Sequence, residues 1–307
     1  MRIIFLGTSE FAVASLDAIN RAAYEIVGVV TAPDKPAGRG MHLQQSPVKK
    51  YAVENNLKVL QPVKLRDPEF IKELESLKAD LQIVIAFRML PETVWNMPSL
   101  GTINLHASLL PDYRGAAPIN WAIINGEKKS GVSTFFLKHD IDTGDILMQE
   151  ELEIREDMTA GELHDALMDL GSKVILKSLN LIEDGKIMGT PQKMDSTKIA
   201  PKIFKNHCLI DWNQAGSTIN NLIRGLSPYP AAFLIFESKN MKVYKSIFEP
   251  SSHNFKNGEI ISDQKTFLKI ACTDGFISLT DVQLESKKRM LIEDFLRGHH
   301  LTNFIQK

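Results

Sequence analysis

The chain has 307 residues, of which 44% are hydrophobic and 24% are charged, and its formal net charge at pH 7 is −1. The length favours about two domains, and the composition is ordinary for a globular protein. The sequence contains no run of about 18 apolar residues, which excludes a predicted membrane-spanning helix, and a net charge near zero does not by itself indicate a nucleic-acid binder.

The first elements predict a Rossmann-like beginning. A strand is predicted at residues 2–6, because the continuous apolar run that follows Arg2 is typical of a buried parallel strand. Helical spacing follows at residues 11–19, with Ser9 as the expected N-cap, and a second strand is predicted at residues 24–31. Only Gly7 stands where a dinucleotide-binding loop needs three glycines, so the sequence argues against a nicotinamide oxidoreductase.

Residues 33–47 predict a long surface loop. They hold three prolines and two glycines, and the region around them is basic, with Lys35, Arg39, Lys49 and Lys50. Loops of this length are commonly functional. The basic side chains suit contacts with nucleic-acid phosphates, while the alternative is a solvated connection.

Further helices and strands continue the α/β pattern. We expect helices at residues 47–56 and 70–77 and strands at residues 59–60 and 81–87. Arg88 to Pro91 follow the last of these strands. On composition alone, Phe87, Met89 and Leu90 suit either the protein core or an apolar wall of a binding site.

The most informative stretch is residues 101–145. Ile103 and Leu105 alternate with Asn104 and His106, which predicts a strand with an amide and an imidazole on one face. A turn signal at residues 110–112 ends it, and ligands bind near the carboxyl ends of strands in open α/β sheets. A second strand is predicted at residues 132–137, followed by a loop that contains Asp142.

These three polar side chains form a set suited to acyl transfer without a covalent enzyme intermediate. The Asn104 amide can donate to a developing oxyanion, and the His106 imidazole can act as an acid or an electrostatic partner. The Asp142 carboxylate can orient the imidazole if the two strands are neighbours. Each residue taken alone is more often structural.

The C-terminal third has a different pattern. A long amphipathic helix is predicted at residues 160–182, a linker at 186–203 and a helix at 215–226. Short strands are predicted at residues 232–236, 241–248, 258–261, 268–272 and 276–284, and these five strands with a closing helix at 290–297 predict a small barrel. Residues 204–307 carry 13 Lys and Arg against 10 Asp and Glu, a mild positive charge.

Cys208 and Cys272 are expected to be buried, reduced thiols of a cytoplasmic protein, because two cysteines this far apart do not indicate a disulfide framework.

Three motifs resemble the 10-formyltetrahydrofolate-dependent formyltransferases: Asn104 to Pro111, Tyr113 to Ile119, and Asp142 to Asp145. The resemblance is greatest to those members that formylate the methionine of initiator methionyl-tRNA. It continues at Asp34 to Gly40 and at Arg224 to Phe233, so it covers nearly the whole chain. One departure is Phe87-Arg88, where the family usually has Tyr-Gly.

The resemblance implies an α/β fold with two domains: a Rossmann-like, mostly parallel catalytic domain at residues 1–185, a linker at 186–203, and an OB-like tRNA-binding β-barrel at 204–307. It also implies that the formyl donor is 10-formyltetrahydrofolate, that the acceptor is initiator methionyl-tRNA, and that no metal takes part. We further expect a monomer that does not bind a membrane.

The resemblance assigns roles to individual residues. It makes Asn104, His106 and Asp142 catalytic. The residues that it places around the folate are Phe87, Arg88, Met89, Leu90, Ser108, Leu109, Leu110 and Pro111. It makes the segment Asp34 to Gly40 a tRNA-recognition loop in which Arg39 reaches the acceptor end, and the basic composition of the region adds Lys35, Lys49 and Lys50 as expected tRNA contacts.

Other interpretations remain open at this point. A glycinamide ribonucleotide formyltransferase would use the same three catalytic residues but should need only the first domain. A formyltetrahydrofolate hydrolase would also share them, and would carry a regulatory domain before the catalytic one. A non-catalytic RNA-binding protein on the same scaffold is the alternative from a different class, and the presence of all three polar residues argues against it.

Overall fold

The computed structural model describes residues 1–37, 42–186, 189–193, 198–301 and 305–306. The chain divides into two compact units. The N-terminal unit comprises Met1–Gly115, Ser130–Leu152 and His164–Ile199, and the C-terminal unit comprises Ala116–Lys129, Glu153–Leu163 and Ala200–Lys307. The domain boundaries near residues 185 and 204 that the sequence suggested stay a prediction.

A seven-stranded sheet with the order β10-β9-β7-β6-β1-β2-β5 forms the N-terminal unit. The pairs β1–β2, β1–β6, β2–β5 and β6–β7 are parallel, and β7–β9 is antiparallel. This confirms the predicted mostly parallel α/β fold. The strands are β1 (Arg2–Gly7), β2 (Glu25–Val30), β5 (Val59–Leu60), β6 (Leu81–Ile85), β7 (Thr102–His106), β9 (Lys129–Phe136) and β10 (Ile146–Glu153).

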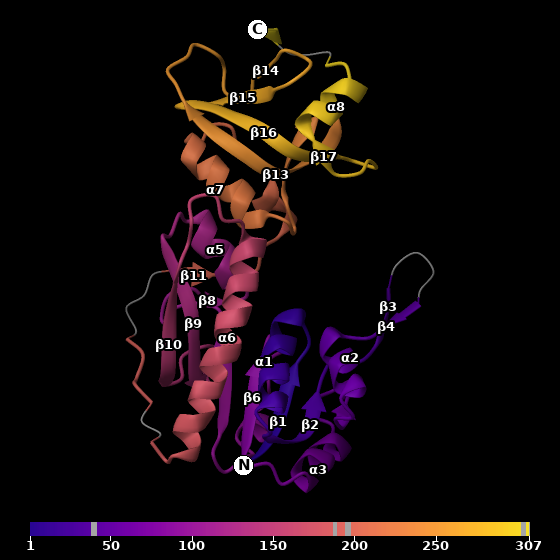
Figure 1. Cartoon of the computed structure of the whole chain (residues 1–307), viewed down its shortest axis with the longest axis vertical. Coiled ribbons are helices and arrows are strands. Elements are labelled where there is room, and N and C mark those ends of the chain that lie inside the picture. The colour runs from indigo at the N-terminus through magenta and orange to yellow at the C-terminus, as the bar shows by residue number, and fades with distance from the viewer. Residues whose placement is uncertain (38–41, 187–188, 194–197, 302–304, 307) are drawn as a thin grey trace. The chain divides into compact units, whose positions relative to one another are not determined.

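Helices cover both faces of this sheet. On one face α1 and α6 run side by side (Figure 1) and touch through the rings of Phe11 and His164. On the other face, core residues of α3 and α4 pack against Ile4 and Val84 of the sheet. The helices are α1 (Glu10–Arg21), α2 (Pro47–Glu54), α3 (Pro68–Ser76), α4 (Glu92–Trp95) and α6 (Ala160–Glu183). Ser9 precedes α1 as expected, although its hydroxyl makes no capping hydrogen bond, whereas Ser46 does cap α2.

The segment expected to be one long loop contains a short hairpin. Strands β3 (Lys35–Ala37) and β4 (His42–Gln44) pair antiparallel, with Lys35 opposite Gln44 (Figure 1). Proline at the second position of β3 does not prevent this, because an edge strand can lack one backbone donor. Two further short strands, β8 (Arg114–Gly115) and β11 (Ile199–Ala200), also belong to the structure.

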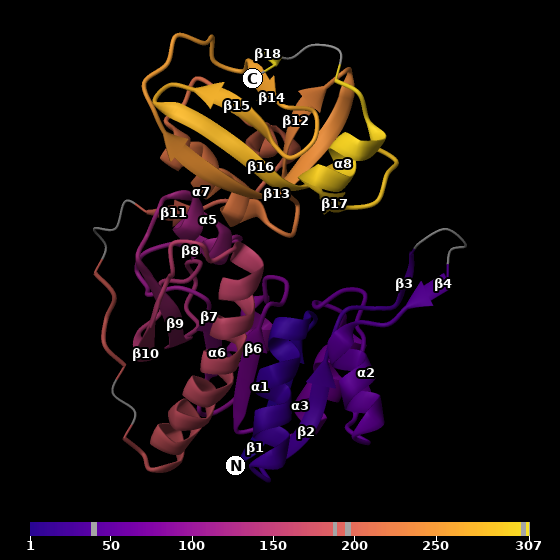
Figure 2. The ribbon, with the colours of Figure 1, turned by 45° about the horizontal axis from the view of Figure 1, so that its top comes forward.

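The C-terminal unit is built on a mostly antiparallel sheet with the order β12-β13-β16-β15-β14-β18 (Figure 2), in which β17 also pairs with β16 and the β14–β18 pair is parallel. Its core contains Ile219 and Ile223 of α7, residues of the sheet and Phe295 of α8. The elements are α5 (Pro118–Ile124), η1 (Lys205–Cys208), α7 (Gly216–Leu226), β12 (Ala232–Phe236), β13 (Lys239–Pro250), β14 (Ile260–Ser262), β15 (Leu268–Cys272), β16 (Gly275–Leu284), β17 (Met290–Leu291), α8 (Ile292–Gly298) and β18 (Ile305–Gln306).

The strands of this unit agree closely with the five predicted ones, but the predicted barrel is not closed. Among the described residues, β12 and β18 are the two ends of the strand order and do not pair. A register shift in β13 between Val243 and Ser246 bends the sheet without joining its edges. In the described part of the chain, every helix is too short or too polar to cross a membrane.

Candidate active site

Strand β7 places Asn104 and His106 on the same face of the sheet. Asn104 lies opposite Phe135 of β9 and beside Val84 of β6, and His106 lies opposite Ser133. Leu105 points to the other face, where it packs so closely on Gly171 of α6 that an added Cβ would lie 2.7 Å from it. The alternation read from the sequence therefore sets which side chains reach the site.

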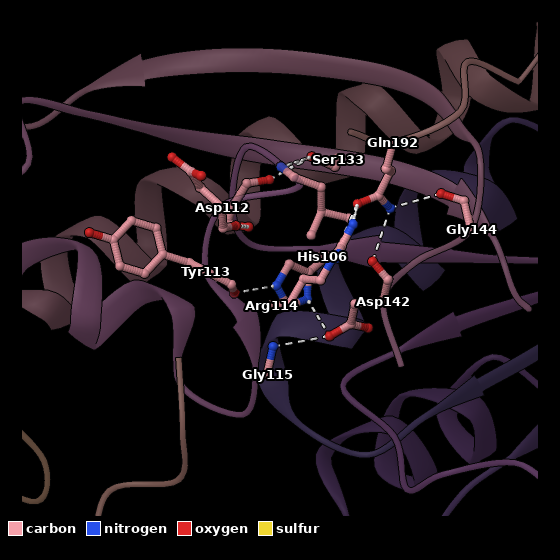
Figure 3. Close-up of polar contacts among 11 residues, drawn as sticks. His106, Asp112, Tyr113, Arg114, Gly115, Ser133, Asp142, Gly144 and Gln192 are labelled. Atoms are coloured by element: carbon pink, nitrogen blue, oxygen red, sulfur yellow. Dashed lines mark hydrogen bonds and ion pairs between the residues drawn. The ribbon is translucent and has the colours of Figure 1, made fainter. Parts of the chain in front are cut away.

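His106 is held by the backbone of the turn that follows its strand. Its Nε2 lies 3.0 Å from the carbonyl oxygen of Tyr113 (Figure 3). Because a carbonyl oxygen only accepts, Nε2 is the protonated nitrogen of the neutral ring. The other nitrogen, Nδ1, faces Asp142 Oδ2 at 3.9 Å. The imidazole is 8% exposed, so little water reaches it.

Asp142 lies in the loop between β9 and β10. Its Oδ2 accepts a hydrogen bond of 3.1 Å from the Gly115 backbone N–H, and its side chain is 12% exposed. The loop turns sharply: Asp142 has a φ of +55°, and a Cβ on Gly144 would lie 1.5 Å from the Phe136 carbonyl oxygen. The structure thus brings together the three residues that the sequence proposed, with the carboxylate aimed at the ring.

The separation between His106 and Asp142 is informative about their chemistry. At 3.9 Å the two atoms form an ion pair when the ring is protonated, but they are too far apart for a direct hydrogen bond. A water molecule or a substrate amine can bridge such a gap. The Asn104 amide makes no hydrogen bond to the other described residues, so its donors are available to a ligand.

The turn at residues 108–111, predicted to line the folate, rests on two polar side chains of neighbouring strands. Ser133 Oγ accepts from the Leu110 N–H at 3.0 Å and donates to the Ser108 carbonyl oxygen at 2.6 Å. Gln149 Nε2 donates to the Leu110 carbonyl oxygen and to Ser133 Oγ, each at 2.8 Å. These contacts fix the conformation of the turn. Within it, Leu109 and Pro111 are half-buried.

The second predicted folate segment, after β6, has mixed surroundings. Leu90 is buried in the core, Phe87 is half-buried against it, and Met89 is 74% exposed. Arg88 donates to the backbone carbonyl oxygens of Val63, at 2.9 Å, and Pro62. The left-handed backbone lies at Ala86, with φ +47°, so Arg88 does not need the freedom of a glycine.

The predicted tRNA-binding lysines differ in what surrounds them. Lys35 and Lys50 are exposed. Lys49 instead forms a half-buried ion pair of 2.5 Å with Asp34, whose other oxygen accepts from Gln61 at 2.8 Å. The hydrogen bonds from Lys49 and Gln61 hold the pKa of Asp34 below its usual value. Arg39 lies outside the described residues.

Sequence reasoning missed the residues that hold the site together. Gln192 donates to the Asp142 and Gly144 carbonyl oxygens at 2.9 and 2.8 Å and accepts from Arg114. It stands in a segment whose composition predicts only a linker, 50 residues from Asp142, and no local pattern marks it. Tyr113 and Gly115 act through backbone atoms, which no side-chain motif reveals.

The C-terminal unit contains a cavity of about 610 Å³. Aromatic rings and lysines share its lining, including Phe204, Tyr229, Phe233, Lys205 and Lys242. Lys205 Nζ lies 5.9 Å from the centre of the Phe233 ring, which is within the range of a cation–π contact. The described residues show no group of three or more His, Cys, Asp or Glu side chains arranged to hold a metal ion.

Comparison with known proteins gives a consistent result. A family model described as "Formyl transferase" matches residues 1–179, and one described as "Formyl transferase, C-terminal domain" matches residues 202–300. The chain is 50% identical over 311 aligned residues to the methionyl-tRNA formyltransferase of Bacteroides fragilis, covering 98% of this chain and 96% of the relative. It is 52% identical to that of Flavobacterium johnsoniae, covering 97% and 96%.

Solved structures share the fold at low sequence identity. An N-formyltransferase from Helicobacter canadensis, in complex with folinic acid and dTDP-3-aminofucose, matches with a TM-score of 0.70 and 21% identity over 94% of this chain and 99% of that one. HypX from Aquifex aeolicus, in complex with tetrahydrofolic acid, matches with a TM-score of 0.66 and 19% identity over all of this chain. This chain spans about half of HypX, 49% of its length.

Proposed function

The chain belongs to the formyl transferase family, and from that premise we propose how its own residues perform the reaction. The protein is an enzyme that transfers the formyl group of 10-formyltetrahydrofolate to the α-amino group of methionine on initiator methionyl-tRNA, for translation initiation. The observation that carries this function is the identity of 50% to a methionyl-tRNA formyltransferase over 98% of the chain.

Asn104, His106 and Asp142 form the catalytic set. The neutral amine of methionine attacks the formyl carbon and forms a C–N bond, and the formyl oxygen becomes an oxyanion. An α-amine titrates near pH ~8, so a useful fraction is neutral at pH 7. The unpaired Asn104 amide donates to the oxyanion, an interaction that lowers the barrier by roughly 3–4 kcal/mol.

The same set moves one proton. The attacking amine loses a proton to the His106 Nδ1 and Asp142 pair, whose 3.9 Å separation leaves room for a bridging water or the amine itself. As the bond between the formyl carbon and the folate N10 breaks, this proton passes to N10. Tyr113 holds the ring through Nε2, so Nδ1 is the nitrogen that gains and loses the proton.

The turn at residues 108–111, in which Ser108 and Leu110 are buried and Leu109 and Pro111 are half-buried, lines the folate together with the segment 87–90. The turn is fixed by Ser133 and Gln149, and a rigid turn suits a site that must hold the donor in one orientation. Met89 is exposed and would be covered by the bound ligand, whereas Leu90 supports the segment from the core.

Basic side chains bind the tRNA. Lys35 and Lys50 are exposed on and beside the β3–β4 hairpin, and Arg39 belongs to the same predicted segment. Residues 204–307 form the tRNA-binding domain, and the cavity lined by Phe204, Tyr229 and lysines suits an unpaired nucleotide, since bases stack on aromatic rings. The protein acts as a monomer in the cytoplasm, apart from any membrane.

A substrate comparison tests this function. The purified protein and 10-formyltetrahydrofolate are incubated in parallel with initiator methionyl-tRNA, elongator methionyl-tRNA or glycinamide ribonucleotide, and the formylated product is quantified. We expect formylation of initiator methionyl-tRNA alone. Formylation of glycinamide ribonucleotide, or release of formate without any acceptor, would instead assign one of the other folate-dependent activities.

A single-turnover experiment tests the site. We expect His106→Ala to slow formyl transfer by about 10²–10⁴-fold, the usual contribution of a positioned acid or base. The exposed Lys72 of α3, which has no role in the proposed site or in tRNA binding, supplies the control Lys72→Ala. Transfer by His106→Ala at the wild-type rate would overturn the proposed role of the imidazole.

A further inference from the structure

The Gln192 side chain lies at the centre of the hydrogen bonds that join Arg114 to the Asp142 loop (Figure 3). Its Nε2 donates to the carbonyl oxygens of Asp142 and Gly144, at 2.9 and 2.8 Å. Its Oε1 accepts from Nε and Nη2 of Arg114, at 3.1 and 2.5 Å. A primary amide has two N–H donors, and both are used here, so the partners at its two ends fix its orientation.

The loop that Gln192 holds has a conformation that its own residues do not favour. Asp142 has a φ of +55°, in the left-handed region that most side chains avoid. The backbone at Gly144 passes so close to the Phe136 carbonyl oxygen that no larger residue fits. The carbonyl oxygens of Asp142 and Gly144 converge on one point, and two such dipoles repel each other unless a donor lies between them. Gln192 supplies that donor.

Three consecutive residues connect this arrangement to the catalytic groups. The Tyr113 carbonyl oxygen accepts from His106, the Arg114 side chain donates to Gln192, and the Gly115 N–H donates to the Asp142 carboxylate. The imidazole and the loop that carries the carboxylate are therefore both fastened to one tripeptide. The position of the loop relative to that tripeptide depends on Gln192, because it bridges the two.

We propose that Gln192 and Arg114 are a positioning pair that holds the Asp142 carboxylate at the distance from His106 that formyl transfer requires. Neither residue is assigned a contact with the reacting atoms. The inference rests on the catalytic role proposed above for Asp142. It assigns a function in the reaction to Gln192, which stands in a segment that by composition reads only as a connection between domains.

A substitution can disrupt the hydrogen bonds from Gln192 to the loop while keeping its interaction with Arg114. Gln192→Glu keeps oxygen acceptors for the Arg114 guanidinium but places a carboxylate oxygen against the two loop carbonyl oxygens, which repels them. We expect its kcat to fall by about 10–100-fold, as for a catalytic group displaced by about 1 Å. The KM values for folate and tRNA should change by less than about threefold, because the substrates are still bound. The exposed neighbour Lys193 supplies the control, and Lys193→Ala should have the wild-type kcat.

A double-mutant cycle distinguishes positioning from a general loss of structure. In the background of Asp142→Asn, where the carboxylate has already been removed, Gln192→Glu should lower kcat by less than about twofold, since two residues that act as one unit are not additive. Thermal unfolding of each variant reports whether the fold is retained. If Gln192→Glu does not fold, Arg114→Lys, which keeps the charge but loses the fork of donors, replaces it in the same cycle.

The outcomes separate this inference from the proposed function. A wild-type kcat for Asp142→Asn would overturn the catalytic role of the carboxylate and, with it, the positioning pair. If kcat is low in the Asp142→Asn variant but equal to wild type in the Gln192→Glu variant, the proposed positioning role of Gln192 and Arg114 is wrong and the catalytic role of Asp142 stands. Equal losses caused by Gln192→Glu with and without the carboxylate would also overturn it, because the glutamine would then act on something other than Asp142.

Discussion

At the scale of single residues, Asn104 differs from His106 and Asp142, its two proposed catalytic partners. His106 is bonded to the Tyr113 carbonyl oxygen and Asp142 to the Gly115 N–H, whereas the Asn104 amide has no partner among the described residues. The Asn104 amide is therefore suited to stabilise a transient negative charge, because it can donate to that charge without first breaking a hydrogen bond within the protein.

Two substitutions of Asn104 should therefore slow the reaction. Asn104→Ala should lower kcat by about 10²–10³-fold with little change in KM, the usual cost of removing an oxyanion donor. Asn104→Asp, which keeps the shape but offers a negative acceptor, should be at least as slow. Single-turnover formylation at saturating folate and tRNA measures both. Near-normal kcat in Asn104→Asp would show that the oxyanion is stabilised elsewhere.

The same residues show what a sequence can and cannot reveal about a site. Alternation along one strand predicts Asn104 and His106 on one face of the sheet, and the loop that follows the next predicted strand contains Asp142. Gln192 contacts that loop because the chain comes back to the sheet about 50 residues later, in a segment that has no hydrophobic periodicity. Tyr113 acts through its backbone carbonyl oxygen. Contacts between residues far apart in the sequence, and contacts made by backbone atoms, cannot be predicted from the pattern of side chains.

At the scale of elements, the start of α6 shows how a helix that packs on the catalytic sheet is secured. The side chain of Glu162 accepts from the Thr159 N–H at 2.8 Å and from its hydroxyl at 2.7 Å, while Thr159 Oγ1 accepts from the Glu162 N–H at 3.3 Å. This is a capping box, which ties the exposed Glu162 to the residue that precedes the helix. The hydrogen bonds from Thr159 lower the pKa of Glu162 from its usual value.

The lowered pKa gives a pH-dependent prediction. A carboxylate whose folded-state pKa is depressed stabilises the protein above its unfolded pKa, near 4.5, and loses that contribution as the pH falls through the folded value. Glu162→Ala should therefore lower the free energy of unfolding at pH 7 by up to about 1 kcal/mol, with solvent screening the exposed charge. Urea unfolding at several pH values measures it, and the difference from wild type should shrink below pH 4.5.

A matched control is Glu162→Gln, which can still form a capping box but has no charge. It should lose less stability than the alanine variant at pH 7 and keep its remaining contribution in acid. An alanine variant as stable as wild type at pH 7 would show that solvent and backbone replace the cap.

Most elements could be predicted, and the exceptions have local causes. The strands at residues 232–236 and 268–272 match their predicted bounds, because buried apolar runs between turn residues are unambiguous. The strand β10, Ile146–Glu153, was not predicted. The burial of its side chains alternates along much of the strand, but its apolar residues do not alternate with polar ones in the sequence. The β3–β4 hairpin was hidden by the surrounding prolines and glycines, and the open edges of the C-terminal sheet depend on pairings that no single strand encodes.

At the scale of the whole molecule, the two cysteines report on the integrity of the C-terminal unit. Cys208 and Cys272 are free and 3% and 0% exposed within its core, and burial raises the pKa of both thiols. Thiol reagents attack the thiolate, so both groups should react slowly in the native protein at pH 8. Chromogenic thiol titration should detect two thiols per chain in denaturant and almost none without it. Rapid labelling of the native protein would show that this core opens easily.

Binding of tRNA is the property that the overall charge explains least. The net charge is −1, so the molecule as a whole does not attract a polyanion, and binding must depend on local groups of lysines. Each lysine–phosphate contact releases counterions, which makes the slope of affinity against salt concentration a count of such contacts. The lysines near the hairpin differ in a useful way, because Lys50 is exposed and Lys49 is paired with Asp34.

We therefore expect Lys50→Ala to weaken tRNA binding and to reduce the logarithmic salt slope by about 0.7–0.9. Lys49→Ala should change the slope less and instead lower stability, because it leaves the half-buried Asp34 without its cation. Filter binding of initiator methionyl-tRNA between low and moderate salt, with urea unfolding of the same variants, separates the two effects. If Lys49→Ala changed the slope as much as Lys50→Ala, the ion pair with Asp34 would have to open when the tRNA binds.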